Sequence, residues 1–311
     1  MAAALRLGLI GAGRWGRNYV RTVASLPQVR LARLASRNPE SARLVPADCA
    51  IFADWRELLD PRALDGVIVA TPPRLHAEMA WRAIDAGLPV LVEKPFTLNV
   101  AQARSVRDRA VARGVLVMVG HTQLYHPAYR ALKSMQPQYG RIREIRAEAG
   151  NLGPYRPDVS VLWDWGAHDV AMCLDLVGAM PSRAGATVVE RKSVEDGIGE
   201  TVEVEFAFPD GASASLRLSN LTQKRRRFAV ACERALLVYD DLAAQKLVVT
   251  EGGGGRAIGI ADDLPLGIAV SEFAEAIAAR SRNTTSVELG VRVVEVLAAC
   301  AQAASPSAAG R

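Results

Sequence analysis

A glycine pattern near the start of the chain constrains the fold more than any other feature. Leu5 to Ile10 reads as a buried strand, and Gly11-Ala12-Gly13-Arg14-Trp15-Gly16 follows it at once, before a helical run through Leu26. This G-x-G-x-x-G pattern, placed between a strand and a helix, is typical of a dinucleotide-binding turn. The glycines permit the tight turn, the close approach of a pyrophosphate and close helix–strand packing, and the helix N-terminus favours the anion. We therefore assign cofactor binding to Gly11, Gly13, Arg14, Trp15 and Gly16.

The end of the second strand predicts which dinucleotide is bound. The strand Val29 to Ala35 leads into Ser36 and Arg37, where an NAD site usually carries an acid that accepts from the ribose 2′-hydroxyl. A hydroxyl and a guanidinium suit a 2′-phosphate instead. We expect NADP to be preferred, with NAD possible. The alternative is that Arg37 is a solvent-facing turn residue that stacks loosely on adenine.

The pattern of strand followed by helix continues to about residue 122. The strand 65–70 runs into Thr71 and Pro72 and then a helix from Arg74 to Ala86. Thr71 is expected near the cofactor and Pro72 in a rigid turn, whereas His76 in the first helical turn suits a contact with the neighbouring backbone. All three are kept as cofactor-site candidates. The alternation predicts a Rossmann-type, doubly wound parallel sheet in residues 1–122.

A charge pair follows another buried strand of this domain. Leu91 and Val92 lead into Glu93-Lys94-Pro95. Pro95 favours an extended conformation at Lys94, so the ammonium leaves the strand end in a defined direction. Because ligands of open parallel sheets bind at the carboxyl ends of the strands, Lys94 and Glu93 are candidates for the site. An ordinary strand-end ion pair facing water is the alternative.

The second part of the chain has a different pattern. Residues 123–311 carry consecutive strand-like runs joined by turns such as Pro209-Asp210-Gly211, which predicts an α+β domain with an open-faced, mainly antiparallel sheet. The run Gly252–Gly255 is expected to be a flexible loop, and residues from Pro306 onward a frayed tail. An open sheet face and its edges usually need covering, so we expect a homodimer or a homotetramer.

A helix expected over residues 161–176 carries a second pair of chemical groups. Asp164 and His168 are four residues apart and therefore project from one face. A carboxylate one turn from an imidazole can orient the ring and raise its proton affinity, as a general base for a hydroxyl requires. Trp163 and Trp165 can wall a sugar-sized pocket. A helix-surface contact of little consequence is equally compatible with the spacing.

Composition excludes several classes of protein. The net charge of +5 over 311 residues is spread along the chain, which suits small anionic ligands but not nucleic acid, and Lys224–Arg227 is expected to be a solvent-exposed basic strand or turn. The sequence contains no signal-peptide layout and no run long enough to span a membrane, and it has no metal-ligand spacing. The four scattered cysteines predict reduced core residues of a cytoplasmic protein.

Taken together, the motifs resemble the Gfo/Idh/MocA family of NAD(P)-dependent sugar and polyol oxidoreductases. The resemblance is carried by the glycine turn, Ala70-Thr71-Pro72-Pro73 with His76, Glu93-Lys94-Pro95 and Asp164-Trp165-Gly166-Ala167-His168. It implies a Rossmann domain followed by an open antiparallel sheet. It also implies that Lys94 is the catalytic lysine and that Asp164 and His168 are the acidic and histidine members of the catalytic set.

Further residues are similar to family members from bacterial surface-polysaccharide pathways. These are 120–127, 151–156 and 163–164, and the resemblance implies oxidation of the C3 hydroxyl of a nucleotide-linked amino sugar. Many family members have Arg where Leu124 stands, which leaves the substrate class open. Two other functions are considered: a non-catalytic dinucleotide sensor and a redox-neutral NAD-dependent sugar enzyme. The presence of Lys94, Asp164 and His168 together favours a sugar dehydrogenase or reductase.

Overall fold

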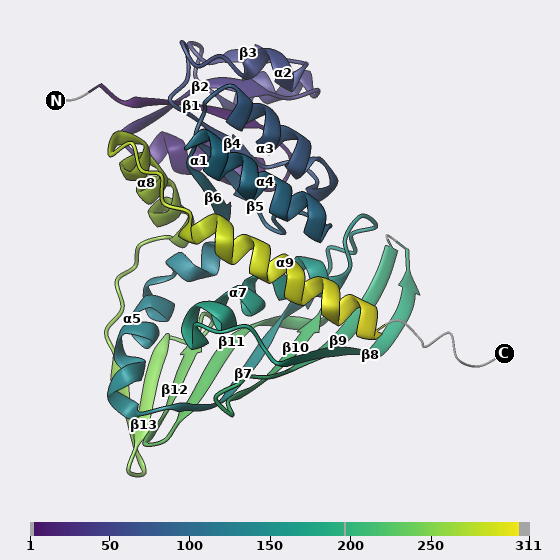
Figure 1. The fold of residues 1–311 in the computed structure, drawn as a ribbon, viewed down its shortest axis with the longest axis vertical. Coiled ribbons are helices and arrows are strands. Elements are labelled where there is room, and N and C mark those ends of the chain that lie inside the picture. The colour runs from purple at the N-terminus through teal and green to yellow at the C-terminus, as the bar shows by residue number, and fades with distance from the viewer. Residues whose placement is uncertain (1–2, 196, 305–311) are drawn as a thin grey trace. The chain divides into compact units, whose positions relative to one another are not determined.

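The computed structural model describes residues 3–195 and 197–304, and within them the chain divides into two compact units (Figure 1). The first unit holds the described residues up to Thr122 together with Leu264–Val291. The second holds Gln123–Asp263 and the described residues from Arg292 onward. The tail expected from Pro306 onward lies outside the described residues.

The first unit is built on a parallel sheet with the strand order β3-β2-β1-β4-β5-β6. The strands are β1 (Leu5–Ile10), β2 (Val29–Ala35), β3 (Ala50–Phe52), β4 (Gly66–Val69), β5 (Val90–Glu93) and β6 (Val117–Gly120). Every residue of β4, β5 and β6 is buried, as expected for apolar strands covered on both faces. The expectation of a doubly wound parallel sheet is confirmed.

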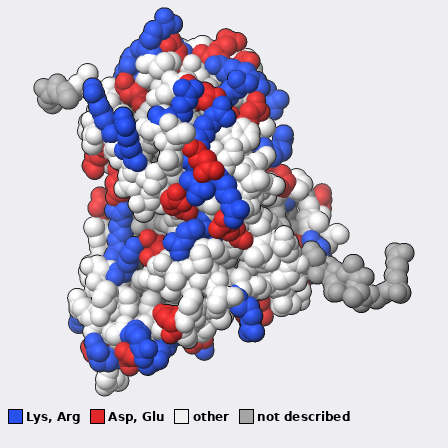
Figure 2. Space-filling model, in the orientation of Figure 1, with Lys and Arg blue, Asp and Glu red and all other residues white. Residues whose placement is uncertain are grey.

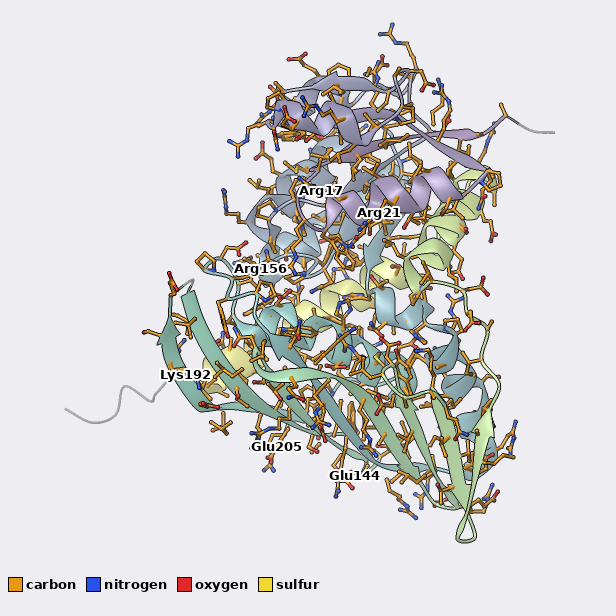
Figure 3. All side chains as sticks on the ribbon, turned by 180° about the vertical axis from the view of Figure 1, so that it is seen from behind. Arg17, Arg21, Glu144, Arg156, Lys192 and Glu205 are labelled. Carbon is orange, nitrogen blue, oxygen red and sulfur yellow. The ribbon has the colours of Figure 1, made fainter. Side chains whose placement is uncertain are left out.

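Helices cover both faces of this sheet. They are α1 (Gly16–Ser25), α2 (Trp55–Leu58), α3 (His76–Asp85) and α4 (Val100–Arg113), with short 3₁₀ turns η1 (Pro39–Leu44) and η2 (Pro73–Leu75). Helix α1 packs on β1 and β2, whereas α3 packs on β4, β5 and α4. The order of the strands reverses direction after β1, so right-handed crossovers bring α1 and α3 to opposite faces (Figures 1 and 3).

Helix α8 (Pro265–Ala278) belongs to the first unit, although residues 123–311 had been expected to form the second. A Cβ atom at Gly66 in β4 would lie 2.6 Å from Ile277 Cδ1 and 3.2 Å from the ring of Phe273. Phe273 is fully buried there. The apolar face of α8 therefore completes the cover over β4, which sequence order alone does not reveal. Helix α9 (Thr285–Ala304) begins in the same unit.

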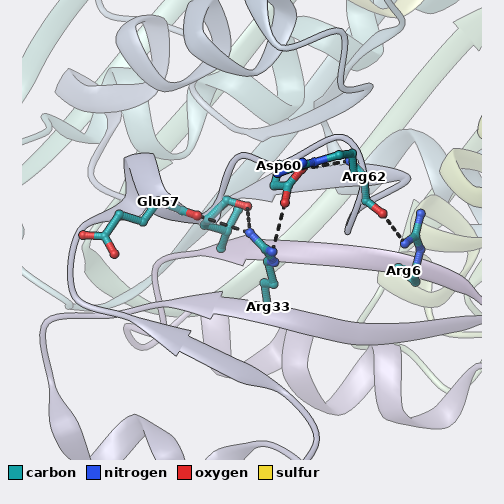
Figure 4. Close-up of polar contacts among 6 residues, drawn as sticks. Arg6, Arg33, Glu57, Asp60 and Arg62 are labelled. Atoms are coloured by element: carbon teal, nitrogen blue, oxygen red, sulfur yellow. Dashed lines mark hydrogen bonds and ion pairs between the residues drawn. The ribbon is translucent and has the colours of Figure 1, made fainter.

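Two arginines fix the segment between β3 and β4 (Figure 4). The guanidinium of Arg33 donates to the carbonyl oxygen of Glu57 at 3.2 Å and to the carboxylate of Asp60 at 3.3 Å. Arg6 donates to the carbonyl oxygen of Arg62 at 2.7 Å. Such partly exposed pairs add little stability, so their effect is to hold the segment against strands β1 and β2.

The second unit is built on a mostly antiparallel sheet with the order β14-β13-β12-β11-β7-β10-β9-β8; among its described strands only β7 and β10 pair in parallel. The strands are β7 (Ile142–Leu152), β8 (Arg183–Val194), β9 (Gly197–Ala207), β10 (Ser213–Ser219), β11 (Leu221–Cys232), β12 (Ala235–Asp240), β13 (Leu247–Glu251) and β14 (Gly254–Ile258). This confirms the expected open-faced sheet.

Strand β14 differs from the flexible loop expected at Gly252–Gly255. Gly252 and Gly253 form the turn, and Gly254 and Gly255 pair with Glu251 and Thr250 of β13. The pairing of β14 with β13 is made by backbone hydrogen bonds. Because β14 lies at the edge of the sheet, its residues need no side chains that pack against a further strand. Glycine is disfavoured in strands but tolerated at such an edge.

One face of this sheet is covered and the other is open. Helices α5 (Pro127–Met135), α6 (Val161–Asp164) and α7 (Gly166–Val177) lie on one face, and α7 packs on β7 and β10. In β10 the residues alternate between exposed and buried, which is the pattern of a half-covered strand. The described residues of this unit place no helix on the opposite face, from which Glu144 and Glu205 project (Figures 1 and 3).

Candidate functional site

The glycine turn after β1 has the geometry that a dinucleotide requires. Gly11 has φ +100°, and a Cβ atom there would lie 2.6 Å from the carbonyl oxygen of Ala70. A Cβ atom at Gly16 would overlap the carbonyl oxygen of Gly11. At Gly13 a Cβ atom would meet nothing within 4 Å among the described residues, so the backbone is open to an incoming group. The turn thus combines tight packing at two glycines with open space at the one between them.

The N-terminus of α1 is available to an anion. No side chain among residues 3–195 and 197–304 caps this helix, and its first turn contains no acidic residue. Its free N–H groups and positive dipole end favour a phosphate. These features fit the pyrophosphate of a dinucleotide, which Gly11, Gly13, Arg14 and Gly16 would hold through their backbone.

The carboxylate of Glu93 ties this turn to the end of β5. Glu93 is buried and accepts from Trp15 Nε1 at 2.6 Å, from the Tyr19 hydroxyl at 2.6 Å and from the N–H of Lys94 at 3.0 Å. Burial raises the pKa of the Glu93 carboxyl above its ordinary value, and the hydrogen bond from Tyr19 and the nearby Lys94 ammonium oppose that rise. The structure therefore brings together Trp15, Glu93 and Lys94, which are far apart in the sequence.

His76 links the ends of two strands. The fully buried ring lies with Nε2 2.8 Å from the carbonyl oxygen of Thr71, after β4, and Nδ1 3.0 Å from that of Pro95, after β5. The Thr71 hydroxyl donates to the sulfur of Met79 at 3.3 Å. His76 and Thr71 therefore brace the loops at the carboxyl edge of the sheet, as the expected backbone contact of His76 implies.

Lys94 follows β5 directly at that edge. Its side chain is partly exposed, whereas the next residues, Pro95 and Phe96, are buried. A lysine with a buried, rigid attachment and a partly exposed ammonium is suited to contact a ligand oxygen at the strand end.

The end of β2 is followed by an exposed cation. Ser36 Oγ lies 2.8 Å from Ser41 Oγ and accepts from the N–H of Asn38 at 3.2 Å, so this hydroxyl belongs to the turn. Arg37 is exposed, and no ion pair joins it to another described residue. Arg37 is thus the group at this position that remains open to a 2′-phosphate.

In the second unit, Asp164 and His168 lie on either side of a helix junction. A single helix had been expected, but α6 ends at Asp164 and α7 begins at Gly166. Trp165 keeps helical angles, and the N–H of His168 bonds to the carbonyl oxygen of Trp165 at 3.2 Å, as in a 3₁₀ turn. The Cβ of a larger residue at Gly166 would lie 3.1 Å from Leu218 Cδ1, so α7 sits close on the sheet.

The surroundings of these two residues differ. Asp164 is partly exposed and pairs with Arg156, whose Nη1 is 3.6 Å from Asp164 Oδ1. Arg156, labelled in Figure 3, also forms a two-pronged pair with Asp158 at 3.2 and 2.9 Å. His168 is buried. A buried imidazole is compatible with proton transfer to or from a ligand hydroxyl.

A buried ion pair beside His168 was missed by the sequence analysis. Arg226 was expected in an exposed basic stretch, but it is buried and pairs with Asp169 of α7 at 3.0 Å. Lys224 and Arg225 are exposed as expected. The alternation of β11 explains the difference, because Arg226 faces the helices and its neighbours do not. The sequence did contain one signal of this pair: Asp169 is an acidic residue within the largely apolar run Gly166–Leu174, so it needs a buried partner.

Neither a metal cluster nor a membrane helix is found in the described chain. Residues 3–195 and 197–304 contain no group of three or more His, Cys, Asp or Glu side chains that could hold a metal ion. No helix within those ranges is long and apolar enough to cross a membrane. On the face drawn in Figure 2, acidic and basic side chains are interspersed.

A parallel sheet with a glycine turn, joined to a second, mostly antiparallel sheet, defines a Rossmann-type dinucleotide-binding protein of two units. Residues 5–121 match the model of an oxidoreductase family with an NAD-binding Rossmann fold, and residues 134–238 match the Gfo/Idh/MocA C-terminal domain. The chain belongs to the Gfo/Idh/MocA oxidoreductase family.

Individual relatives agree with this assignment. A UDP-N-acetylglucosamine 3-dehydrogenase of Acidithiobacillus ferrooxidans is 35% identical over 182 residues, which span 57% of this chain and 56% of that protein. Its crystal structure is similar with a TM-score of 0.84 at 28% identity, covering 97% of this chain and 98% of that one. A putative oxidoreductase from Magnetospirillum magnetotacticum has a TM-score of 0.91 at 46% identity, covering 96% and 99%.

Proposed function

We propose that the protein is an NADP-dependent dehydrogenase or reductase of a hydroxyl group in a nucleotide-linked sugar. The observation that carries the proposal is the Glu93 cluster, which joins the dinucleotide-binding turn to the strand end bearing Lys94. Glu93 thereby links the glycine turn, which is expected to hold a dinucleotide, to Lys94, which is expected to contact the reacting oxygen. The joint presence of Lys94, Asp164 and His168 favours an enzyme over a sensor.

Each catalytic residue has a role set by its chemistry. A bound nicotinamide supplies or accepts the hydride. His168 takes the proton of the substrate hydroxyl in the oxidative direction, and the Lys94 ammonium stabilises the developing alkoxide. Asp164 orients the imidazole or accepts from a neighbouring hydroxyl of the sugar. In the reductive direction the same residues act in reverse.

The preference for NADP rests on Arg37. It is an exposed cation at the end of β2, and Ser36 and Arg37 occupy the position where an NAD site usually has an acid. The substrate class is inferred from the relative named UDP-N-acetylglucosamine 3-dehydrogenase, with which the matched segment spans just over half of each chain.

The proposal is tested by mixing the purified protein with UDP-N-acetylglucosamine and either NADP⁺ or NAD⁺ and following nicotinamide absorbance. We expect turnover, faster at low cofactor concentration with NADP⁺. Turnover with inositol but not with the nucleotide sugar would contradict the substrate class. A nicotinamide that stays bound and does not exchange would instead favour the redox-neutral alternative.

We also propose that the protein forms a homodimer or a homotetramer through the open sheet face. On that face Leu236 is 39% exposed and pairs across the ladder with Ala231, beside the partly exposed Val238. Exposed apolar residues on an uncovered sheet favour association with a second copy. Sedimentation of the wild type and of Leu236→Arg tests this, and a monomeric wild type would contradict it.

A further inference from the structure

A buried ion pair connects α7 with the sheet beneath it. Arg226 Nη1 in β11 lies 3.0 Å from Asp169 Oδ1 in α7. The exposed fraction of the side chain is 8% for Arg226 and 1% for Asp169, so both charges are removed from solvent. The same guanidinium lies over the ring of Trp165, with Cζ 5.6 Å from the ring centroid.

The two contacts of Arg226 enclose the segment that carries His168. Trp165 precedes the first turn of α7, and Asp169 follows His168 directly. No side chain within the described ranges caps the start of α7, and the bond from His168 to Trp165 is of the 3₁₀ type. The start of α7 therefore lacks the side-chain cap that would fix its backbone locally. Arg226 adds a polar constraint from the sheet on both sides of His168, beside the apolar packing of α7.

Stability alone is a poor explanation for this pair. Removing two charges from water carries a large desolvation cost, which their mutual attraction offsets only in part, and a buried apolar pair of the same volume is often as stable. A charged pair has an advantage where direction matters, because a planar guanidinium that both bonds a carboxylate and stacks on an indole permits one arrangement.

We infer that Arg226 and Asp169 are positioning residues for His168. This inference rests on the proposed function, in which His168 exchanges a proton with the substrate hydroxyl. Arg226 holds Trp165 and Asp169, these residues fix the first turn of α7, and the turn fixes where the imidazole points. A displacement of that ring by about an ångström is enough to slow proton transfer up to about 100-fold.

The test compares Arg226→Gln with its neighbour Arg225→Gln, which is exposed on the other face of the same strand. With UDP-N-acetylglucosamine and NADP⁺, R226Q should lower kcat by about 10- to 100-fold and leave the KM for NADP⁺ within about twofold, whereas R225Q should change neither. Arg226→Lys should recover only part of the loss, since it keeps the charge but not the planar fork.

The decisive measurement is a double-mutant cycle with His168→Asn. If Arg226 acts through His168, R226Q should cost little further kcat in the H168N background. An equal loss in both backgrounds would overturn the positioning role while leaving the proposed function intact. An H168N variant with wild-type kcat would instead overturn the proposed function. If R226Q does not fold, the double variant D169N/R226Q replaces it, because this neutral pair leaves no unpaired buried charge. Its kcat is measured with and without H168N, and the same outcomes support or overturn the positioning role.

Discussion

The indole nitrogen of Trp15 lies 2.6 Å from Glu93 Oε1, across 78 residues of sequence. Trp15 belongs to the glycine turn and Glu93 to the strand end that bears Lys94. The Tyr19 hydroxyl reaches the same oxygen at 2.6 Å. One carboxylate therefore sets the position of the first turn of α1 relative to β5, and a ligand held by that turn is placed with respect to Lys94.

Glu93→Gln should weaken dinucleotide binding. The amide keeps the volume, but it is a weaker acceptor for the two side-chain donors and loses the charge that strengthens both bonds. We expect the Kd for NADP⁺ to rise about tenfold, measured by calorimetry, and the protein to unfold at a lower temperature. The exposed Glu57, changed to Gln, is the matched control. An unchanged Kd in E93Q would show that the glycine turn keeps its position without this carboxylate.

Lys94→Met should abolish most of the turnover and leave cofactor binding intact. Methionine keeps the length of the side chain and removes the ammonium that stabilises the alkoxide, a loss of about 100-fold or more in kcat. Exposed Lys192 in β8, labelled in Figure 3 and changed to Met, should leave kcat unaltered. Steady-state kinetics and a binding titration measure the two quantities. Wild-type turnover in K94M would rule out the assigned role.

Arg37→Ala should reduce the preference for NADP. Loss of a charge-assisted contact to the 2′-phosphate should raise the Kd for NADP⁺ by about tenfold and leave that for NAD⁺ unchanged. Arg43, an exposed arginine paired with Glu40 in η1, provides the control variant R43A. Tighter binding of NAD⁺ than NADP⁺ by the wild type would contradict the interpretation of Ser36 and Arg37.

Acid should destabilise the second unit through Asp241. The hydrogen bond from His126, at 3.0 Å, and the charge of Lys246 lower the pKa of this carboxyl from 3.8 to about 2. Because the folded pKa lies below the unfolded one, the stabilisation is complete above the unfolded value and is lost as pH falls from about 3.8 to about 2. Asp241→Asn should therefore lower the free energy of unfolding by about 2 kcal/mol at neutral pH and flatten its dependence in that window. Urea titrations across the pH range measure both, and an unchanged pH dependence in D241N would contradict this account.

The buried cysteines should react slowly in the native protein. Burial raises the pKa of the Cys49 and Cys300 thiols to about 11, so little thiolate is present near neutral pH. The thiol of Cys173 is fully buried, and its pKa is also raised. A thiol reagent should label these residues rapidly in denaturant and slowly in buffer. Rapid native labelling of Cys49 would show that its environment opens to solvent.

Much of the fold follows from local pattern, and the exceptions have a common cause. Helix α4 begins and ends at local signals, because Asn99 caps it and Gly114 ends it in the left-handed conformation. The assignment of residues 123–311 to one domain placed helix α8 in the second unit, since its partner β4 lies about 200 residues earlier in the chain. Strand β14 was missed because its glycines carry no apolar alternation.

In the candidate site, too, local motifs could be predicted from the sequence and long-range contacts could not. The glycine turn, Glu93, Lys94, Asp164 and His168 stand in short motifs whose chemistry can be recognised locally. The roles of Glu93 as an acceptor for Trp15 and Tyr19, and of Arg226 as the partner of Asp169, depend on contacts across 57 or more residues.

The sequence by itself determined the class of fold and the position of the glycine turn, because spacing and residue type act over a few positions of the chain; the residues proposed to bear the chemistry were found in the same way. Only the tertiary structure decided which charges are buried. The side chain of Arg226 is removed from water while that of adjacent Arg225 is exposed. A strand turns successive side chains to opposite faces, and the described helices of this unit cover one face of the sheet.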